Sequence, residues 1–314
     1  MGVGLSWTSH HVTLCEARRR GNSVEILRTS STPLSPRALV PSFNTPNIQN
    51  LQECDEALAM TLSQAKITRS PVAVSLPDPS VRIRLLSEEP QGGTREEKKR
   101  LLAWQLRDSL PFPPDQARLD YLSLSTNGSV PPLPGEHRAA SPRPPRDDSS
   151  ILCLIASSAV ISQYEEILRR HRLFPVQIGA SSLSLWNLWE ASSQEHGAKR
   201  LPGESLCFLF VEDTHATVLI FTSGRPRFWR CLLEGAEALP ALIQEVGDSL
   251  CSLTEEGALP DLPRVLVHST GTLGGEIAEA LRRNLDLTVE QVEWIGSFPH
   301  DPALLPALGA SLFL

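Results

Sequence analysis

The residues that could do chemistry in this chain are scattered, and none stands at the spacing of a familiar catalytic or metal-binding motif. The sequence holds no GxSxG nucleophile turn, no HExxH zinc helix and no GxxxxGK[ST] phosphate loop. Its six cysteines form no CxxC pair, and none has a histidine at ligand spacing, which predicts small buried side chains. His10 and His11 are adjacent at the start of an expected strand, so they point to opposite faces and cannot easily share one ion.

Two clusters of like charge have structural interpretations. The basic run at 169–172 ends an expected amphipathic helix, where positive charge complements the helix dipole. This interpretation is favoured over a phosphate site, which stays the alternative. Asp147 and Asp148 fall in a proline-rich stretch, and we expect them to be solvated rather than catalytic.

Composition excludes several classes of protein. The chain has 314 residues, of which 41% are hydrophobic, and a formal net charge of -7. This is long and apolar enough for a packed protein of one or two domains, and too acidic for a dominant nucleic-acid surface. No apolar run reaches the roughly 18 residues of a membrane span. The N-terminal basic cluster follows the apolar part, so no signal peptide is expected and the protein is predicted to be cytoplasmic.

The elements that must position any site follow from the hydrophobic patterning. Strands are expected at 3–7, 11–17, 24–27, 72–76, 81–85, 117–124, 151–156, 175–178, 206–211, 216–221, 226–231, 264–268 and 289–294. Helices are expected at 48–67, 158–172, 181–191, 237–256 and 275–285, and one from the capping box at 94–97 to Leu110. The segment 126–149 holds six prolines and is predicted to be a flexible excursion, with a linker as the alternative.

One pattern occurs twice. A strand meander followed by a helix and a strand appears near 1–76 and again near 205–294. Two similar α/β halves with an insertion in the first indicate a duplicated actin-like, or ribonuclease-H-like, fold.

Four stretches carry a resemblance to a family. They are the opening strand and turn at 4–12, the LAWQL, LPFP and LDY segments within 102–121, the helix and turn at 156–175, and the hairpin at 216–230. In order and spacing they resemble the PilM family of type IV pilus assembly, and they are similar to the related cytoplasmic domain of GspL. The resemblance spans nearly the whole chain.

The resemblance implies a division into subdomains. Residues 1–77 and 175–200 would form the first core, 78–174 an inserted α+β subdomain containing the flexible loop 126–149, and 201–314 the second core. In the family a covering subdomain separates the second hairpin from the next long helix. Here that helix follows Gly235 almost at once, so we expect the covering subdomain to be reduced or absent.

The resemblance also implies a nucleotide site, from which this sequence departs. Ser6 and Phe210 stand where the family has aspartates, and Thr8 and Glu212 stand where it has glycines. The residues that could still hold Mg-ATP are Ser6, Thr8, Ser9, Glu212, Asp213, Thr217 and Gly271. We therefore expect no catalytic residue, no dedicated metal site and no cofactor, and bound ATP with Mg is the alternative.

The function that the resemblance implies is a non-catalytic scaffold, a pseudo-ATPase, in the inner-membrane platform of a type IV pilus or type II secretion machine. It would dock the N-terminal cytoplasmic tail of a PilN-like bitopic membrane protein and contact other platform components or an assembly ATPase. Attachment to the membrane would be peripheral, through this partner. The alternative is an actin-fold ATPase acting as a nucleotide-dependent switch. An FtsA-like filament protein is disfavoured, because 303–309 is broken by Pro and Gly and resembles a last core helix.

Overall fold

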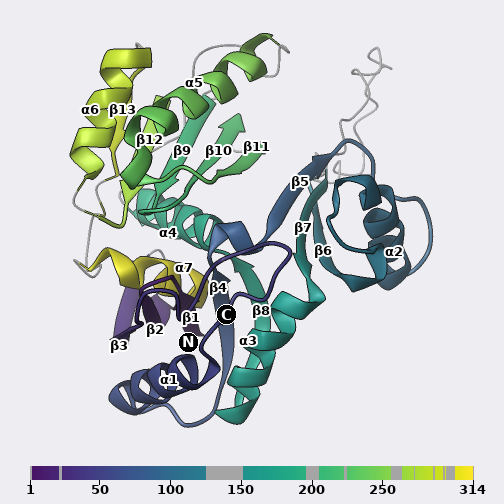
Figure 1. The fold of residues 1–314 in the computed structure, drawn as a ribbon, viewed down its shortest axis with the longest axis vertical. Coiled ribbons are helices and arrows are strands. Elements are labelled where there is room, and N and C mark those ends of the chain that lie inside the picture. The colour runs from purple at the N-terminus through teal and green to yellow at the C-terminus, as the bar shows by residue number, and fades with distance from the viewer. Residues whose placement is uncertain are drawn as a thin grey trace, which may run out of the picture. The chain divides into compact units, whose positions relative to one another are not determined.

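The computed structural model describes residues 2–20, 23–124, 151–195, 205–222, 225–255, 264–271, 273–285, 287–292, 294 and 301–313 (Figure 1). Its contacts divide the chain into a large unit, Met1–Arg82 with Ala156–Leu314, and a small unit, Ile83–Ile155. The division into three subdomains with ends at 77, 174 and 200 stays a prediction. The predicted flexible loop 126–149 lies outside the described residues.

The large unit holds two five-stranded sheets of the same topology. The first sheet has the order β3 (Ser23–Pro33), β2 (His11–Arg20), β1 (Gly2–Trp7), β4 (Ser70–Leu76) and β8 (Leu173–Ala180). The second has the order β11 (Arg225–Leu232), β10 (Ala216–Thr222), β9 (Ser205–Val211), β12 (Arg264–Ser269) and β13 (Val289–Gln291). In both, an antiparallel meander is extended by two parallel strands. The predicted duplicated actin-like α/β fold is confirmed. Strand β13 is shorter than the predicted 289–294.

Six helices described in the large unit cover the sheets (Figure 1). They are α1 (Leu51–Ala65), α3 (Ser158–Arg170), α4 (Ser181–Glu195), α5 (Leu239–Glu255), α6 (Gly274–Leu285) and α7 (Leu305–Ser311). Helix α1 begins later than the predicted 48, because the side chain of Asn50 caps it by accepting the N–H of Glu53. None of the described helices is both long and apolar enough to cross a membrane.

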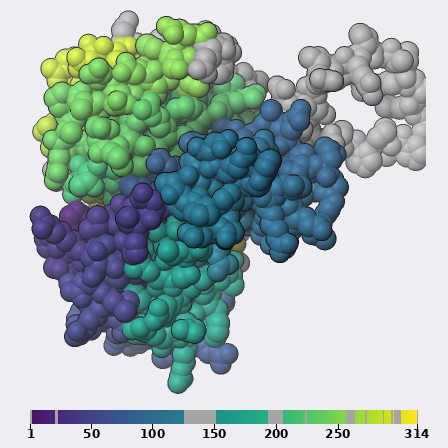
Figure 2. All heavy atoms as spheres, turned by 45° about the vertical axis from the view of Figure 1, so that its right-hand side comes forward, coloured from purple at the N-terminus to yellow at the C-terminus, as the bar shows by residue number. Residues whose placement is uncertain are grey.

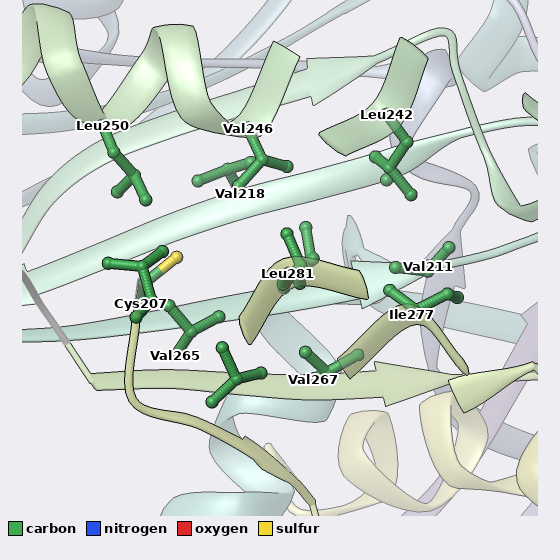
Figure 3. Close-up of a cluster of buried hydrophobic side chains, with 14 of the residues drawn as sticks. Cys207, Val211, Val218, Leu242, Val246, Leu250, Val265, Val267, Ile277 and Leu281 are labelled. Atoms are coloured by element: carbon green, nitrogen blue, oxygen red, sulfur yellow. The ribbon is translucent and has the colours of Figure 1, made fainter. Parts of the chain in front are cut away.

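The core of the second half lies between its sheet and helices α5 and α6 (Figure 3). Leu242, Val246 and Leu250 recur at helical spacing on the buried face of α5. They pack on alternate residues of the sheet, such as Val265 and Val267 of β12. The patterns of period 3.6 and period 2 in the sequence therefore meet in one apolar layer.

The connection from β11 to α5 is short. After Leu232 it contains only the 3-10 turn Ala236–Ala238 before α5 starts at Leu239. This leaves no room for a folded subdomain at that point of the chain.

Helix α7 packs against the first sheet and α4 at very close range. It contacts β1, β2 and β4, and a Cβ atom on Gly4 of β1 would overlap the carbonyl oxygen of Ala307. A Cβ atom on Gly309 of α7 would overlap the carbonyl oxygen of Ser184 in α4. Both approaches require a residue without a side chain.

The small unit contains helix α2 (Arg95–Gln105), and the three-stranded sheet β5 (Arg82–Leu86), β7 (Ile151–Ser157), β6 (Ala117–Ser123) extends through it. The predicted capping box is present: Thr94 Oγ1 accepts the N–H of Glu97, and the Glu97 carboxylate accepts the N–H of Thr94. The prediction that this helix reaches Leu110 is wrong. It ends at Gln105, since the chain tightens into a 3-10 turn ahead of the proline-rich segment that starts at Pro111.

Candidate functional site

The candidate site is built on two hairpin turns at equivalent places in the two halves. The β1–β2 turn is closed by a hydrogen bond from Thr8 N–H to His11 O of 2.9 Å. The β9–β10 turn is closed by one from Glu212 N–H to His215 O, also of 2.9 Å. Each turn has the same length and follows the last paired residue of its strand, Trp7 or Val211. Residues 204 positions apart are therefore structural equivalents.

The first turn satisfies its own amides. The hydroxyl of Thr8 accepts the N–H of His10 at 3.2 Å and that of His11 at 3.0 Å. Ser9 is half-buried in the turn, and Ser6 is buried in β1. Two of the backbone donors that a phosphate-binding turn would offer to a ligand, those of His10 and His11, are thus taken by Thr8.

The second turn is held by the chain segments that follow β11 and β12. The carbonyl of Glu212 accepts the N–H of Ala236 at 2.9 Å, and that of Asp213 accepts the N–H of Glu237 at 3.1 Å. A Cβ atom on Gly235 would overlap both carbonyl oxygens, so this contact depends on glycine. The N–H of Thr270 donates to the carbonyl of Val211 at 3.1 Å.

Asp213 connects three of the predicted segments. Its Oδ2 lies 3.4 Å from Nε2 of His10 in the first turn, and both side chains are about half exposed. A Cβ atom built on Gly271, after β12, would lie 3.7 Å from Oδ1 of Asp213. The carboxyl ends of β1, β9 and β12 therefore meet at this carboxylate.

Two acids near Asp213, Asp78 and Glu212, are buried. Asp78, in the 3-10 turn after β4, accepts the N–H of Ser182 through Oδ1 at 3.1 Å, and burial raises its pKa to about 6. Burial, with the charges of Asp78 and Asp213, raises the pKa of Glu212 to about 8. The hydroxyl of Thr217 lies near Asp78 without a hydrogen bond of normal geometry. At neutral pH Glu212 is therefore mostly protonated.

One hydrogen bond joins the two halves near this site, and an aromatic cluster lies within the second half. Nε1 of Trp229, in β11, donates to Oγ of Ser182 at 3.2 Å, beside the Asp78 contact. Phe210, the equivalent of Ser6, stacks on His268 with ring centroids 5.8 Å apart. The Nε1 of Trp294 donates to Nδ1 of His268 at 3.2 Å. An aromatic cluster thus occupies the place where the PilM resemblance implies a carboxylate.

Mg-ATP in an actin-like site needs free amides in both turns and a carboxylate that faces the metal ion. In the described residues no three His, Cys, Asp or Glu side chains are grouped as a metal ion requires. The structure brings Asp213 and Gly271 together near the first turn, and it places Glu212 and Thr217 in the buried acid cluster with Asp78. The nucleotide contacts predicted for Ser6, Thr8, Ser9, Glu212, Asp213, Thr217 and Gly271 stay a prediction.

The sequence analysis missed Asp78, Ser182 and Trp229. For Asp78 a signal exists: it directly follows β4, which pairs in parallel with β1 and so ends at the same edge of the sheet as the first turn. No comparable signal marks Ser182 or Trp229, because their contact depends on how the two halves meet.

No protein-family model matches the sequence, and no curated protein matches it in sequence. The sheet topology and the paired turns place the chain in the class of actin-like folds. One solved structure of this class is a Bacteroides thetaiotaomicron protein of unknown function with an actin-like ATPase fold. It aligns with a TM-score of 0.52 at 11% identity, over 99% of this chain and 95% of that one.

Two further solved structures come from type IV pilus biogenesis and from type II secretion. The PilM–PilN type IV pilus biogenesis complex aligns with a TM-score of 0.76 at 16% identity, over 99% of this chain and 98% of that one. The cytoplasmic domain of EpsL, an inner-membrane component of the Vibrio cholerae type II secretion system, aligns with a TM-score of 0.50 at 10% identity, over 99% and 94%. At these identities the likeness is one of fold, and in fold the predicted resemblance is confirmed.

Proposed function

We propose that this protein is a non-catalytic scaffold of a type IV pilus or type II secretion platform, and that it docks the cytoplasmic tail of a PilN-like membrane protein. The observation that carries the proposal is the fold likeness to the PilM–PilN complex, with a TM-score of 0.76 over 99% of the chain. A cytoplasmic location, with attachment to the inner membrane through the partner, is part of the same proposal.

The geometry of the two turns supports the non-catalytic part. Thr8 occupies two amides of the first turn, and Oδ2 of Asp213 in the second turn lies 3.4 Å from Nε2 of His10. Phe210 brings no charge to its position. The contacts that join the halves are thus made by the protein's own side chains, which favours a constant shape over a nucleotide-dependent one.

The small unit offers a surface for the partner. Trp104 of α2 is 62% exposed, and the guanidinium of Arg107 lies 4.0 Å from the centre of its ring. Leu101 is one helical turn earlier on the same face and 52% exposed. Exposed tryptophans are frequent hot spots of binding, so we propose that apolar side chains of the tail contact Leu101 and Trp104.

The test is calorimetry with a synthetic N-terminal tail of a PilN-like protein from the same genome. We expect saturable binding that Trp104→Ala weakens about tenfold or more. Met60→Ala is the matched control, because Met60 is exposed on α1 of the large unit. The tail failing to bind would contradict the docking proposal.

A second titration, with Mg-ATP at millimolar concentration, tests the non-catalytic part. We expect no saturable heat. Saturable binding together with hydrolysis would favour the alternative, an actin-fold ATPase that acts as a switch.

A further inference from the structure

A pocket of about 450 Å³ lies at the C-terminal end of α3, where β8 begins and the chain enters β4. The end of α3 is at the lower surface of the large unit in both views (Figures 1 and 2). The pocket is lined by the positively charged Arg69, Arg169 and Arg172 and by the apolar Leu173, Phe174 and Pro175. It uses none of the residues of the candidate site.

The basic run at 169–172 is divided between two tasks. Arg170 pairs with Glu166, and His171 lies 3.2 Å from Asp55. Arg169 and Arg172 have no ion-pair partner within the described residues, and they line the pocket. The helix dipole explains positive charge at the end of α3, but it does not explain why Arg69, from another segment, lines the same pocket. On a chain with a net charge of -7, this concentration of arginines at one pocket is a local exception.

The backbone at Arg172 favours a different residue. Its φ is 57°, in the left-handed region that glycine usually occupies just after a helix. Glycine would therefore suit the fold better at this position. An arginine in this backbone conformation is strained, and such strained residues cluster at functional sites.

The floor of the pocket is apolar and aromatic. Phe174 is 49% exposed, and the guanidinium of Arg69 lies 5.3 Å from the centre of its ring. Leu173 beside it is buried. Glu165, the carboxylate among the lining residues, reduces the positive charge without cancelling it.

We propose that this pocket binds a phosphate group carried on an apolar or aromatic body. The planar guanidinium groups of Arg169 and Arg172 match the geometry of phosphate oxygens, and Phe174 offers its ring to the body. Two sources supply this chemistry: a soluble phosphate ester, or the headgroup of an anionic phospholipid.

The experiment uses the whole protein and one probe for each source. Phenyl phosphate is titrated by calorimetry, with phenol as the control that lacks the anion. Vesicles of equimolar phosphatidylcholine and phosphatidylglycerol are used in sedimentation, with pure phosphatidylcholine as the control. We expect at least one anionic probe to bind, and Arg169→Gln to weaken it about tenfold, the effect of losing one charge-assisted hydrogen bond.

Two variants separate the pocket from bulk charge and from folding. Arg170→Gln removes the same charge from the adjacent residue, which does not line the pocket, and should bind as the parent does. Arg172→Gly should weaken binding while the melting temperature stays equal or rises, because glycine accepts the left-handed backbone.

Each outcome decides the proposal. Loss of phenyl phosphate binding in Arg169→Gln, but not in Arg170→Gln, supports the pocket with a soluble ligand. The same pattern with vesicles supports it with a lipid. Binding of neither probe, or equal weakening by the two substitutions, would overturn it.

Discussion

The two hairpin turns share one backbone frame and differ in what holds them. The first turn is stabilised by its own side chain, because the hydroxyl of Thr8 accepts hydrogen bonds from two amides of the turn. The second is held from outside, by amides of Ala236 and Glu237 on the carbonyls of Glu212 and Asp213. In the equivalent of the Thr8 position, Glu212 is a buried acid whose Oε1 lies 4.0 Å from Nε2 of His215, without a hydrogen bond between them.

This difference shows that the duplication extends to topology and not to chemistry. The turn that is held by its own hydroxyl presents one side chain, His10, to the other half. A turn held by a neighbouring segment is free to turn Asp213 toward the other half and Glu212 toward Asp78. The polar contacts between the halves therefore depend on Gly235, which lets the outside support approach.

The strongest way to break the second turn is Gly235→Ala. The added Cβ atom would overlap the carbonyl oxygens of Glu212 and Asp213, and backbone atoms cannot move aside cheaply. We expect a loss of about 3–5 kcal/mol in the free energy of unfolding. Gly271→Ala is the matched control, because its Cβ atom meets only side-chain atoms at 3.7 Å and 3.9 Å. Equal stability of the two variants in denaturant melts would contradict the close contact of Gly235 with the carbonyl oxygens of Glu212 and Asp213.

The buried acid predicts a dependence on pH that the first turn lacks. The pKa of Glu212 is raised to about 8 in the folded protein, so its contribution to stability is complete below about pH 4.5 and is lost as pH rises through 8. In the parent protein this titration lowers the free energy of unfolding by on the order of 2–4 kcal/mol between pH 5.5 and 8.5. Glu212→Gln should abolish this decrease, because glutamine does not titrate. Glu237→Gln, exposed on the adjacent segment, should leave the slope unchanged.

Two buried histidines, His215 and His268, have the opposite effect on the pH dependence of stability, because they destabilise the fold as pH falls. Burial lowers the pKa of His215 to about 4 and that of His268 to about 3, so their contribution is lost as pH falls below about 6.5. Stability measured across pH should therefore have its maximum in mildly acidic solution. A monotonic rise from acid to alkaline pH would contradict the assignment of Glu212, and no loss of stability below pH 6.5 would contradict that of the histidines.

The hydrogen bonds of Thr8 in the first turn should contribute less to the free energy of unfolding. Thr8→Val keeps the shape of the side chain and removes the acceptor of two N–H groups. We expect a loss of about 1 kcal/mol, since the amides at this edge can turn to water. Ser9→Ala, one residue on and half-buried, is the control and should be close to neutral. If Thr8→Val and Ser9→Ala lower the melting temperature equally, the hydroxyl of Thr8 does not stabilise the turn.

The smallest effect is expected for the pair that joins the turns. His10 and Asp213 are about half exposed, so a double-mutant cycle with His10→Ala and Asp213→Asn should give a coupling of about 0.5 kcal/mol. The coupling should fall when salt is added. A coupling that is larger and independent of salt would mean that the turns are joined more tightly than their exposure indicates.

The sequence predicts the strands and helices well because their patterns are local. The strands around each turn, the capping box at Thr94 and the repetition of the meander all follow from residue periodicity. The ends of α1 and α2 were misplaced, since a single cap at Asn50 and a tightened turn after Gln105 decide them. Local pattern could not reveal the contact of Ser182 with Asp78 or the support at Gly235, because both join residues far apart in the chain.

The contact of α7 with β1 has a consequence for synthesis. Gly4 packs against the backbone of Ala307, which is made 303 residues later in the chain. At about 5–20 residues per second, roughly 15 to 60 seconds separate them on the ribosome. Throughout that time the first sheet lacks the helix that covers β1, β2 and β4, and its apolar face stays open to other chains. The half of the molecule that is synthesised first therefore gains its last covering helix only after the strands of the second half have been made.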